Sequence, residues 1–113
     1  MPLGLIHCTL EEDVMLRDCT LPGLYLTGTH LPKLNAQRLQ CNGPLHLSGG
    51  FQATGLVDMS VATIIGQLDC DDGKFLAKDK ALNCEPISVG ADVLLSEEFE
   101  ARGRIVLFRA VIT

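Results

Sequence analysis

The side chains that could carry chemistry in this sequence are its five cysteines and three histidines, together with several short runs of acids. The cysteines lie at positions 8, 19, 41, 70 and 84, and no two of them form a CxxC pair. This spacing predicts neither a zinc site nor a redox dithiol. A reactive thiol needs a lowered pKa, and no cluster of basic residues lies near Cys8 or Cys19 to lower it. We therefore expect no metal and no cofactor.

The acidic runs are residues 11–13, 71–72 and 97–98 with Glu100. Paired carboxylates can bind a cation or act as an acid and a base, but these runs show no recognisable geometry for either role. We interpret them as solvated turns. The chain also lacks a glycine-rich phosphate motif and the GxSxG context of a nucleophilic serine. The sequence therefore predicts a protein that is not an enzyme.

The elements that position these residues are revealed by an internal repeat. Residues 51–64 (FQATGLVDMSVATI) recur 48 residues later as residues 99–112 (FEARGRIVLFRAVI). Within the repeat, small or apolar residues return every five or six positions, and a second one precedes most of them by two. The series contains Leu16, Leu21, Leu26, Leu31, Ala36, Cys41, Leu47, Ala53, Met59, Ile64, Cys70, Phe75, Cys84, Val89, Leu95, Ala101, Leu107 and Ile112.

Neither a helix of period 3.6 nor a long alternating strand produces this spacing. It is typical of a very short strand followed by a turn, repeated, with both side chains of each apolar pair on one face. A chain that turns the same way after every pair forms a β-solenoid around a filled interior. Eight steps of the series span the 48-residue repeat, which favours four sides and about 24 residues per coil. We therefore predict an all-β, single-stranded, four-sided β-helix.

Two segments carry a family resemblance: GGFQATGLV at 49–57 and ATIIGQLDC at 62–70. They resemble divergent pentapeptide-repeat proteins, and more closely the repetitive bacterial proteins often labelled membrane-associated oxidoreductases. The resemblance covers roughly residues 23 to 113 and implies a right-handed quadrilateral β-helix. The oxidoreductase label has no motif behind it in this chain, so no such activity is carried over.

The expected organisation is one domain, since the chain has 113 residues. We expect an N-terminal cap or lead-in over residues 1–15 and a solenoid of about four coils over residues 16–113. The step from Phe75 to Cys84 is longer than the others, which predicts a loop insertion near residues 76–81. Insertions in solenoids often form binding loops, so Lys78, Asp79 and Lys80 are the candidate interaction residues.

Strand alternation also predicts which side chains are buried. Met59 and Ile64 are expected to face the interior, while Asp58 and Thr63 face outward. The thiols of residues 41, 70 and 84 fall on the inward series, where a small apolar side chain packs well. They are expected to fill the core.

Composition limits the function further. The formal net charge of −5, with no cluster of lysines and arginines, argues against direct nucleic-acid binding. The longest uncharged run, residues 39–57, is too polar for a membrane span, and the absence of a targeting segment predicts a bacterial cytoplasmic protein. We expect a non-enzymatic scaffold that presents its faces to an unknown protein partner. Two alternatives are a gyrase-type DNA mimic and a hexapeptide-like acyltransferase, whose histidine would lie on the coil surface.

The C-terminal coil predicts a self-association site. The repeat continues to the last residues of the sequence, and no capping helix, proline or charge run follows it. An uncapped coil exposes unpaired backbone and one layer of core. A homodimer through this end is therefore expected, formed by Ile105, Leu107, Val111 and Ile112.

Overall fold

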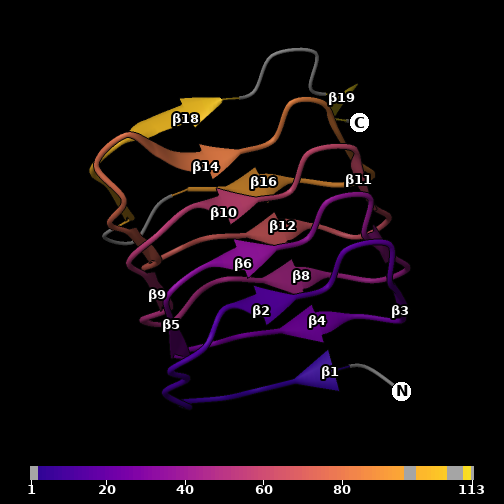
Figure 1. The fold of residues 1–113 in the computed structure, drawn as a ribbon. Coiled ribbons are helices and arrows are strands. Elements are labelled where there is room, and N and C mark those ends of the chain that lie inside the picture. Colours follow the sequence, from indigo (N-terminus) through magenta and orange to yellow (C-terminus); the bar gives the residue numbers. More distant parts are fainter. Residues whose placement is uncertain (1–2, 96–98, 107–110, 113) are drawn as a thin grey trace.

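The computed structural model describes residues 3–95, 99–106 and 111–112, and this part of the chain contains strands and turns but no helix. Its strands form four parallel sheets, which are the four walls of a β-solenoid of about four turns (Figure 1). The predicted all-β, four-sided architecture is confirmed.

The strands are two to four residues long, and each sheet takes one strand from each successive turn. Sheet A contains β1 (Leu3–Gly4), β4 (Leu24–Tyr25), β8 (Leu45–His46), β12 (Leu68–Asp69) and β16 (Val93–Leu94). Sheet B contains β5 (His30–Leu31), β9 (Gln52–Ala53), β13 (Lys74–Phe75) and β17 (Glu100–Ala101). Sheet C contains β2 (Val14–Met15), β6 (Leu34–Asn35), β10 (Val57–Asp58), β14 (Lys80–Asn83) and β18 (Arg104–Val106). Sheet D contains β3 (Thr20–Leu21), β7 (Gln40–Cys41), β11 (Ala62–Ile64), β15 (Ile87–Val89) and β19 (Val111–Ile112).

The strand register explains the sequence repeat. Val57 of β10 pairs with Leu82 of β14, which pairs in turn with Ile105 of β18. Val57 and Ile105 are therefore 48 residues and two turns apart. The predicted coil of about 24 residues is confirmed for this part of the chain.

Alternation along each short strand fills the interior with one apolar column per sheet. Met59 and Ile64 are buried, and the side chains of Asp58 and Thr63 are partly exposed, as predicted. Cys41, Cys70 and Cys84 are buried free thiols. Apolar side chains in the first and last turns are only partly buried, since they pack against a described turn on one side only. These include Leu16, Leu21, Val93, Ala101 and Ile105. Leu95, which belongs to the apolar series of the sequence, is instead 38% exposed.

One row of the core exchanges large and small side chains from turn to turn. Ala53 and Ala101 are the strand partners of Phe75, so a phenylalanine in the middle turn lies between two alanines. The rings of Phe51 and Phe99 pack against Phe75 from the turns on either side, each with its centroid 5.5 Å from that of Phe75. This interlocking arrangement fixes the register of sheet B.

The turns between sheets C and D need left-handed backbone conformations. Asp18, Arg38 and Val61 have φ angles of 62°, 57° and 61°. The first two also form an ion pair, with Arg38 Nε 2.5 Å from Asp18 Oδ1, and this hydrogen bond lowers the pKa of Asp18. Val61 is β-branched, and residues of that kind rarely adopt positive φ.

Outward polar side chains of sheet C brace the same turns. Asn35 Oδ1 accepts a hydrogen bond from the backbone N–H of Gln37, and Asp58 Oδ1 accepts one from Ser60. Asn83 Oδ1 does the same for Glu85. Because the acceptor precedes the donor by two residues each time, these are Asx turns. The column of asparagine and aspartate on this wall is therefore part of the fold.

Two features bear on the expected boundaries. Strand pairing already includes β1 and β2, which lie within residues 1–15 and pair with β4 and β6. The expected insertion near 76–81 is a turn over residues 76–79 followed directly by β14. The register of β14 against β18 shifts between Lys80 and Leu82, so the extra residue, Ala81, forms a bulge and is fully buried.

Candidate interaction surface

The candidate surface is the edge where sheet B turns into sheet C, which we call the charged corner. It comprises the five successive turns over residues 11–13, 32–33, 54–56, 76–79 and 102–103, with the first residues of β14 and β18, Lys80 and Arg104. Backbone contacts stack these turns on one another. Val14 N–H donates to Lys33 O at 2.9 Å, and Arg104 N–H donates to Asp79 O at 2.8 Å. The corner is therefore one continuous column along the solenoid.

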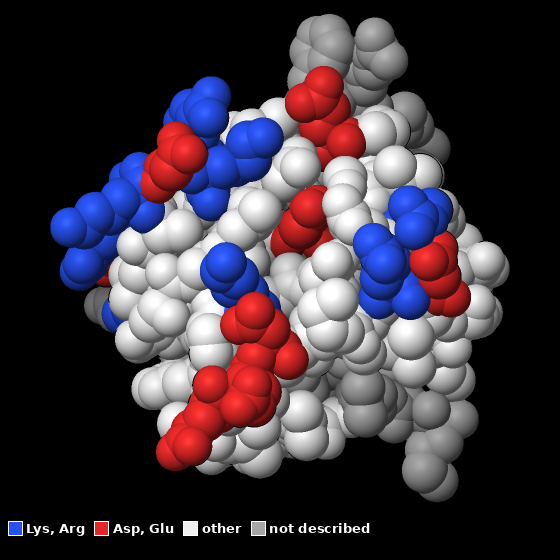
Figure 2. Space-filling model, in the orientation of Figure 1, with Lys and Arg blue, Asp and Glu red and all other residues white. Residues whose placement is uncertain are grey.

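The upper end of the charged corner is basic. Lys78 is exposed, and Lys80 is the register partner of Arg104, so two cations lie in adjacent parallel strands. Arg102 adds a further cation in the turn before β18. Figure 2 shows basic side chains gathered at the upper left of this face. The structure therefore brings the predicted loop residues together with two arginines that sequence reasoning did not assign to a site.

Charge compensation within this basic end is incomplete. Arg104 lies 3.6 Å from the carboxylate of Asp79, whose side chain is 96% exposed, and Arg102 pairs with Glu100 at 2.9 Å. Within the described residues, Lys78 and Lys80 have no ion-pair partner. Like charges in adjacent strands lower stability, and exposed ion pairs offset little of that loss. The basic end thus carries cations available to a partner.

A glycine allows the close stacking at this end. A Cβ atom on Gly103 would lie 2.5 Å from the backbone oxygen of Ala77 and 2.6 Å from that of Asp79. No side chain can occupy that space without moving backbone. Gly103 therefore holds the turn at 102–103 directly over the turn at 76–79, which places the arginines beside the lysines.

The lower end of the charged corner is acidic. Glu11, Glu12 and Asp13 are all exposed, and they occupy the first turn of the column. Acidic side chains extend toward the lower left in Figure 2. The turn at 54–56, between the two ends, contains threonine, glycine and leucine and has no charge. Charge along the corner therefore changes from acidic in the first turn to basic in the fourth and fifth.

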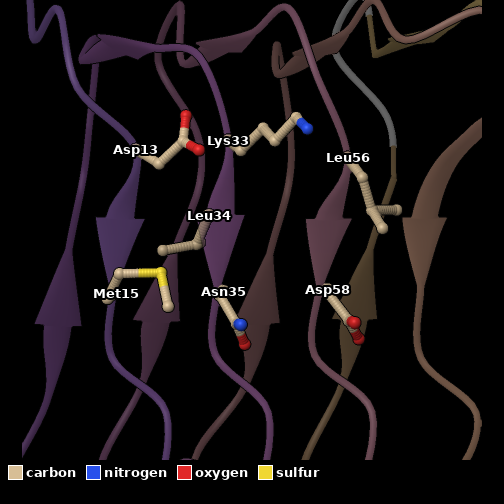
Figure 3. Close-up of a pocket in the computed structure, with 7 residues that line it drawn as sticks. All are labelled: Asp13, Met15, Lys33, Leu34, Asn35, Leu56 and Asp58. Carbon is tan, nitrogen blue, oxygen red and sulfur yellow. The ribbon is translucent and has the colours of Figure 1, made fainter.

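A shallow groove of about 170 Å³ lies beside the corner on sheet C (Figure 3). Its lining residues are Asp13, Met15, Lys33, Leu34, Asn35, Leu56 and Asp58. Asp58 Oδ2 accepts a hydrogen bond from Gln37 Nε2 at 3.0 Å, while Met15, Leu56, Lys33 and the exposed carboxylate of Asp13 remain to meet an occupant. Small-molecule sites usually exceed about 300 Å³. The groove is suited to a side chain of a partner rather than to a substrate or cofactor.

A second outward column lies on sheet A. The rings of Tyr25 and His46 stack with centroids 4.9 Å apart, and His46 Nδ1 lies 3.3 Å from Asp69 Oδ2. Asp69 Oδ1 also accepts a hydrogen bond from the backbone N–H of Asp71. These contacts fix His46 within the wall. The other two histidines, His7 and His30, are exposed.

Burial makes the core thiols unreactive. Desolvation raises the pKa of Cys84 to about 12, and it raises the pKa values of Cys41 and Cys70 as well. With raised pKa values these thiols stay neutral at ordinary pH. Because the thiolate is the reactive form, they are inert. No group of histidine, cysteine, aspartate and glutamate suited to a metal ion occurs in the described part of the chain.

The residues expected to form the dimer end are described only in part. Ile105 lies in β18 and is partly buried. Val111 and Ile112 form β19, which pairs with β15, while Leu107 lies outside the described residues, as do Glu97 and Glu98. The predicted end therefore contains two edge strands, β18 and β19, of the sheets as described.

Comparisons with known proteins return no relatives. No family model matches the chain, and no curated protein or solved structure does. The suspected resemblance to pentapeptide-repeat proteins is thus supported in the fold alone. None of the described residues forms a helix that is long and apolar enough to cross a membrane.

Proposed function

We propose that this protein is a non-enzymatic β-solenoid scaffold that binds a protein partner through its charged corner. The observation that carries the proposal is the in-register pair of Lys80 and Arg104, with Lys78 beside it; among the described residues Asp79 is the only carboxylate in an ion pair with either member. An acidic surface of a partner would relieve the repulsion between these cations. The groove on sheet C, next to the same corner, would accept an apolar side chain of that partner.

A protein partner is favoured over the role of a DNA mimic. The acidic residues are spread over several corners: residues 11–13 lie between sheets B and C, Asp18 between sheets C and D, and Asp71 and Asp72 between sheets A and B. Asp18 and Asp72 are also paired with cations. A mimic of the DNA backbone needs a continuous row of negative charge. This distribution supports a surface of mixed charge that recognises a protein.

A peptide-binding assay tests the proposal. Fluorescently labelled synthetic peptides, each with three or four acidic residues and one leucine, are titrated with the protein and followed by anisotropy. We expect binding that weakens as salt rises, and a several-fold loss in Lys78→Glu, because one exposed ion pair contributes about 0.2–1 kcal/mol.

The matched control is Arg17→Glu, which makes the same charge change at an exposed position outside the charged corner. It should leave peptide affinity nearly unchanged. Equal losses in the two variants would indicate a response to net charge alone, and the proposal would then be wrong. Preferential binding of a DNA duplex would also contradict it.

A homodimer through the C-terminal turn is a competing proposal for how two copies of this chain associate. It is supported by β18 and β19, which pair on one side only within the described residues. Ile112→Lys should then convert a dimer to a monomer in light scattering. The oligomeric state of Ile112→Lys also serves as a control for the self-association contact described in the next subsection.

A further inference from the structure

We infer that the charged corner binds the same corner of a second copy of this chain, with the two solenoid axes antiparallel. The inference rests on the proposed function, since it names an occupant for that surface. The two copies would be related by a two-fold axis perpendicular to the solenoid axis, passing through the third turn of the corner, residues 54–56.

The order of charges along the corner is the main evidence. From the first turn to the fifth, the corner reads acidic (11–13), one lysine (Lys33), uncharged (54–56), mixed basic (78–80) and basic (102–104). A two-fold axis through the third turn places the first turn of one copy against the fifth turn of the other. It places the second against the fourth, and the third against itself.

The two end turns then meet charge of the opposite sign. The triplet at 11–13 faces Arg102 and Arg104 of the second copy, and the reverse contact forms at the other end of the interface. Lys33 faces the mixed turn at 78–80, which carries Lys78 and Lys80 as well as Asp79, whose side chain is 96% exposed. Complementary charge patterns of this kind guide association and fix the orientation of partners.

The alternative orientation is unfavourable. With parallel axes, the acidic turns of the two copies would face one another, as would the basic turns, and like charges in contact oppose binding. The antiparallel contact is also self-complementary, so it closes after two copies and does not extend into a filament. The charge order thus selects both the geometry and the number of copies.

Apolar groups occupy the middle of the proposed interface. Leu56 lies in the third turn, where the two-fold axis would bring two copies of it together. Leu56 also lines the groove, together with Met15, whose side chain is 61% exposed. An apolar centre with a charged rim is the usual arrangement of a protein interface.

The expected dimer is weak. The principal extents of the molecule are 31 × 28 × 25 Å, so one edge and part of one wall can bury only a few hundred Å² per copy. Interfaces below about 1,200 Å² in total are characteristic of transient complexes. We expect a monomer–dimer equilibrium visible at roughly 100 µM protein that shifts to monomer as salt rises, because the ionic contacts are exposed.

Sedimentation equilibrium provides the first measurement. At about 50 mM salt the weight-average mass should rise with concentration from 12.2 kDa toward twice that value, and at about 500 mM salt it should stay near 12.2 kDa. A protein that is monomeric at both salt concentrations overturns the inference. So does a mass that rises beyond the dimer without limit.

Charge exchange provides the second measurement. One variant carries Glu11→Lys, Glu12→Lys and Asp13→Lys, and the other carries Arg102→Glu and Arg104→Glu. Each variant alone should be monomeric, because its first and fifth turns, which face each other in the proposed contact, then carry charge of the same sign. An equimolar mixture should form a heterodimer that includes one copy of each variant, since both ends of the interface are then complementary again. A mixture that stays monomeric contradicts the antiparallel contact.

Two controls keep the result interpretable. Far-UV circular dichroism spectra of both variants should match that of the parent protein, because the changed side chains are exposed and their replacement leaves the core intact. Arg17→Glu should dimerise like the parent. If Ile112→Lys abolishes the dimer while the charge variants retain it, the contact is the C-terminal end and the inference is wrong.

Failure of the dimer inference is distinguishable from failure of the proposed function. A protein that never dimerises but still binds acidic peptides through Lys78 retains the proposed function with another partner. A protein that neither dimerises nor binds peptide loses both proposals.

Discussion

Truncation of Phe75 is the most direct test of how this core is built. The side chain is 0% exposed and lies in the middle turn of a three-ring stack, with tilted contacts to Phe51 and Phe99. Its space exists because its strand partners are alanines and because Gly73, two residues earlier, leaves room for the ring. A Cβ atom on Gly73 would lie 3.1 Å from Phe75 Cε1. Removing the ring therefore opens a cavity between two alanines.

The cost follows from that geometry. Phenylalanine to alanine in a rigid core costs about 3–5 kcal/mol, and the value rises as the cavity fails to collapse. Each aromatic pair adds about 0.5–1.5 kcal/mol beyond buried area, and Phe75→Ala removes two pairs. We therefore expect Phe75→Ala to lower the free energy of unfolding by an amount in the upper half of the range of about 3–5 kcal/mol. Small domains have a total stability of about 5–15 kcal/mol, so the variant should fold but unfold at much lower denaturant.

Urea unfolding followed by circular dichroism measures this loss. Phe75→Leu should cost less than Phe75→Ala, since it leaves a smaller cavity. Lys74→Ala is the matched control on the same strand. It faces outward and loses only a 3.7 Å ion pair to Asp72, so it should cost under about 1 kcal/mol. Equal midpoints for Phe75→Ala and Lys74→Ala would refute the inward and outward assignment of this strand.

Two further predictions concern strain and ionisation. Val61→Gly should stabilise the protein by about 0.5–1.5 kcal/mol, because a β-branched side chain that is 53% exposed is held at positive φ; an unchanged or lower thermal midpoint would contradict this. The neutral thiols of Cys70 and Cys84 have raised pKa values when folded, so their contribution is fully present below the ordinary thiol pKa of 9.0 and is lost as pH rises from there toward 12. The free energy of unfolding measured with urea should fall above pH 9, by up to about 1.4 kcal/mol per pH unit for each thiol, and Cys84→Ala should reduce that slope.

Sequence periodicity was sufficient to predict the fold because burial in a solenoid depends on local spacing. Every wall needs one inward pair per turn, and the five- or six-residue step of the series places Met59 and Ile64 in the core directly. The same reasoning places the thiols of Cys41 and Cys84 inside. None of these assignments depends on contacts between distant segments.

Features that depend on stacking could not be predicted in this way. The bulge at Ala81 arises from a shift of register against β18, and no local pattern marks it. The exchange of Phe75 with alanine in adjacent turns shows only when the strands are aligned. Asp58 appeared as a solvated outward residue, yet its carboxylate accepts hydrogen bonds from Ser60 and Gln37, which gives it a role in holding the turn.

The charged corner shows why a solenoid gives isolated charges a collective effect. The lysines at 78 and 80 and the arginines at 102 and 104 are more than twenty residues apart in sequence, so the sequence marks the lysine loop as a candidate but does not link the arginines to it. Stacking brings successive turns to about 4.8 Å, which is shorter than the screening length of about 8 Å at physiological salt. Charges in neighbouring turns therefore act on one another and on a partner as a single column. Reversing Arg104 alone should consequently weaken partner binding at Lys78 as well, whereas charges on separate corners should behave independently.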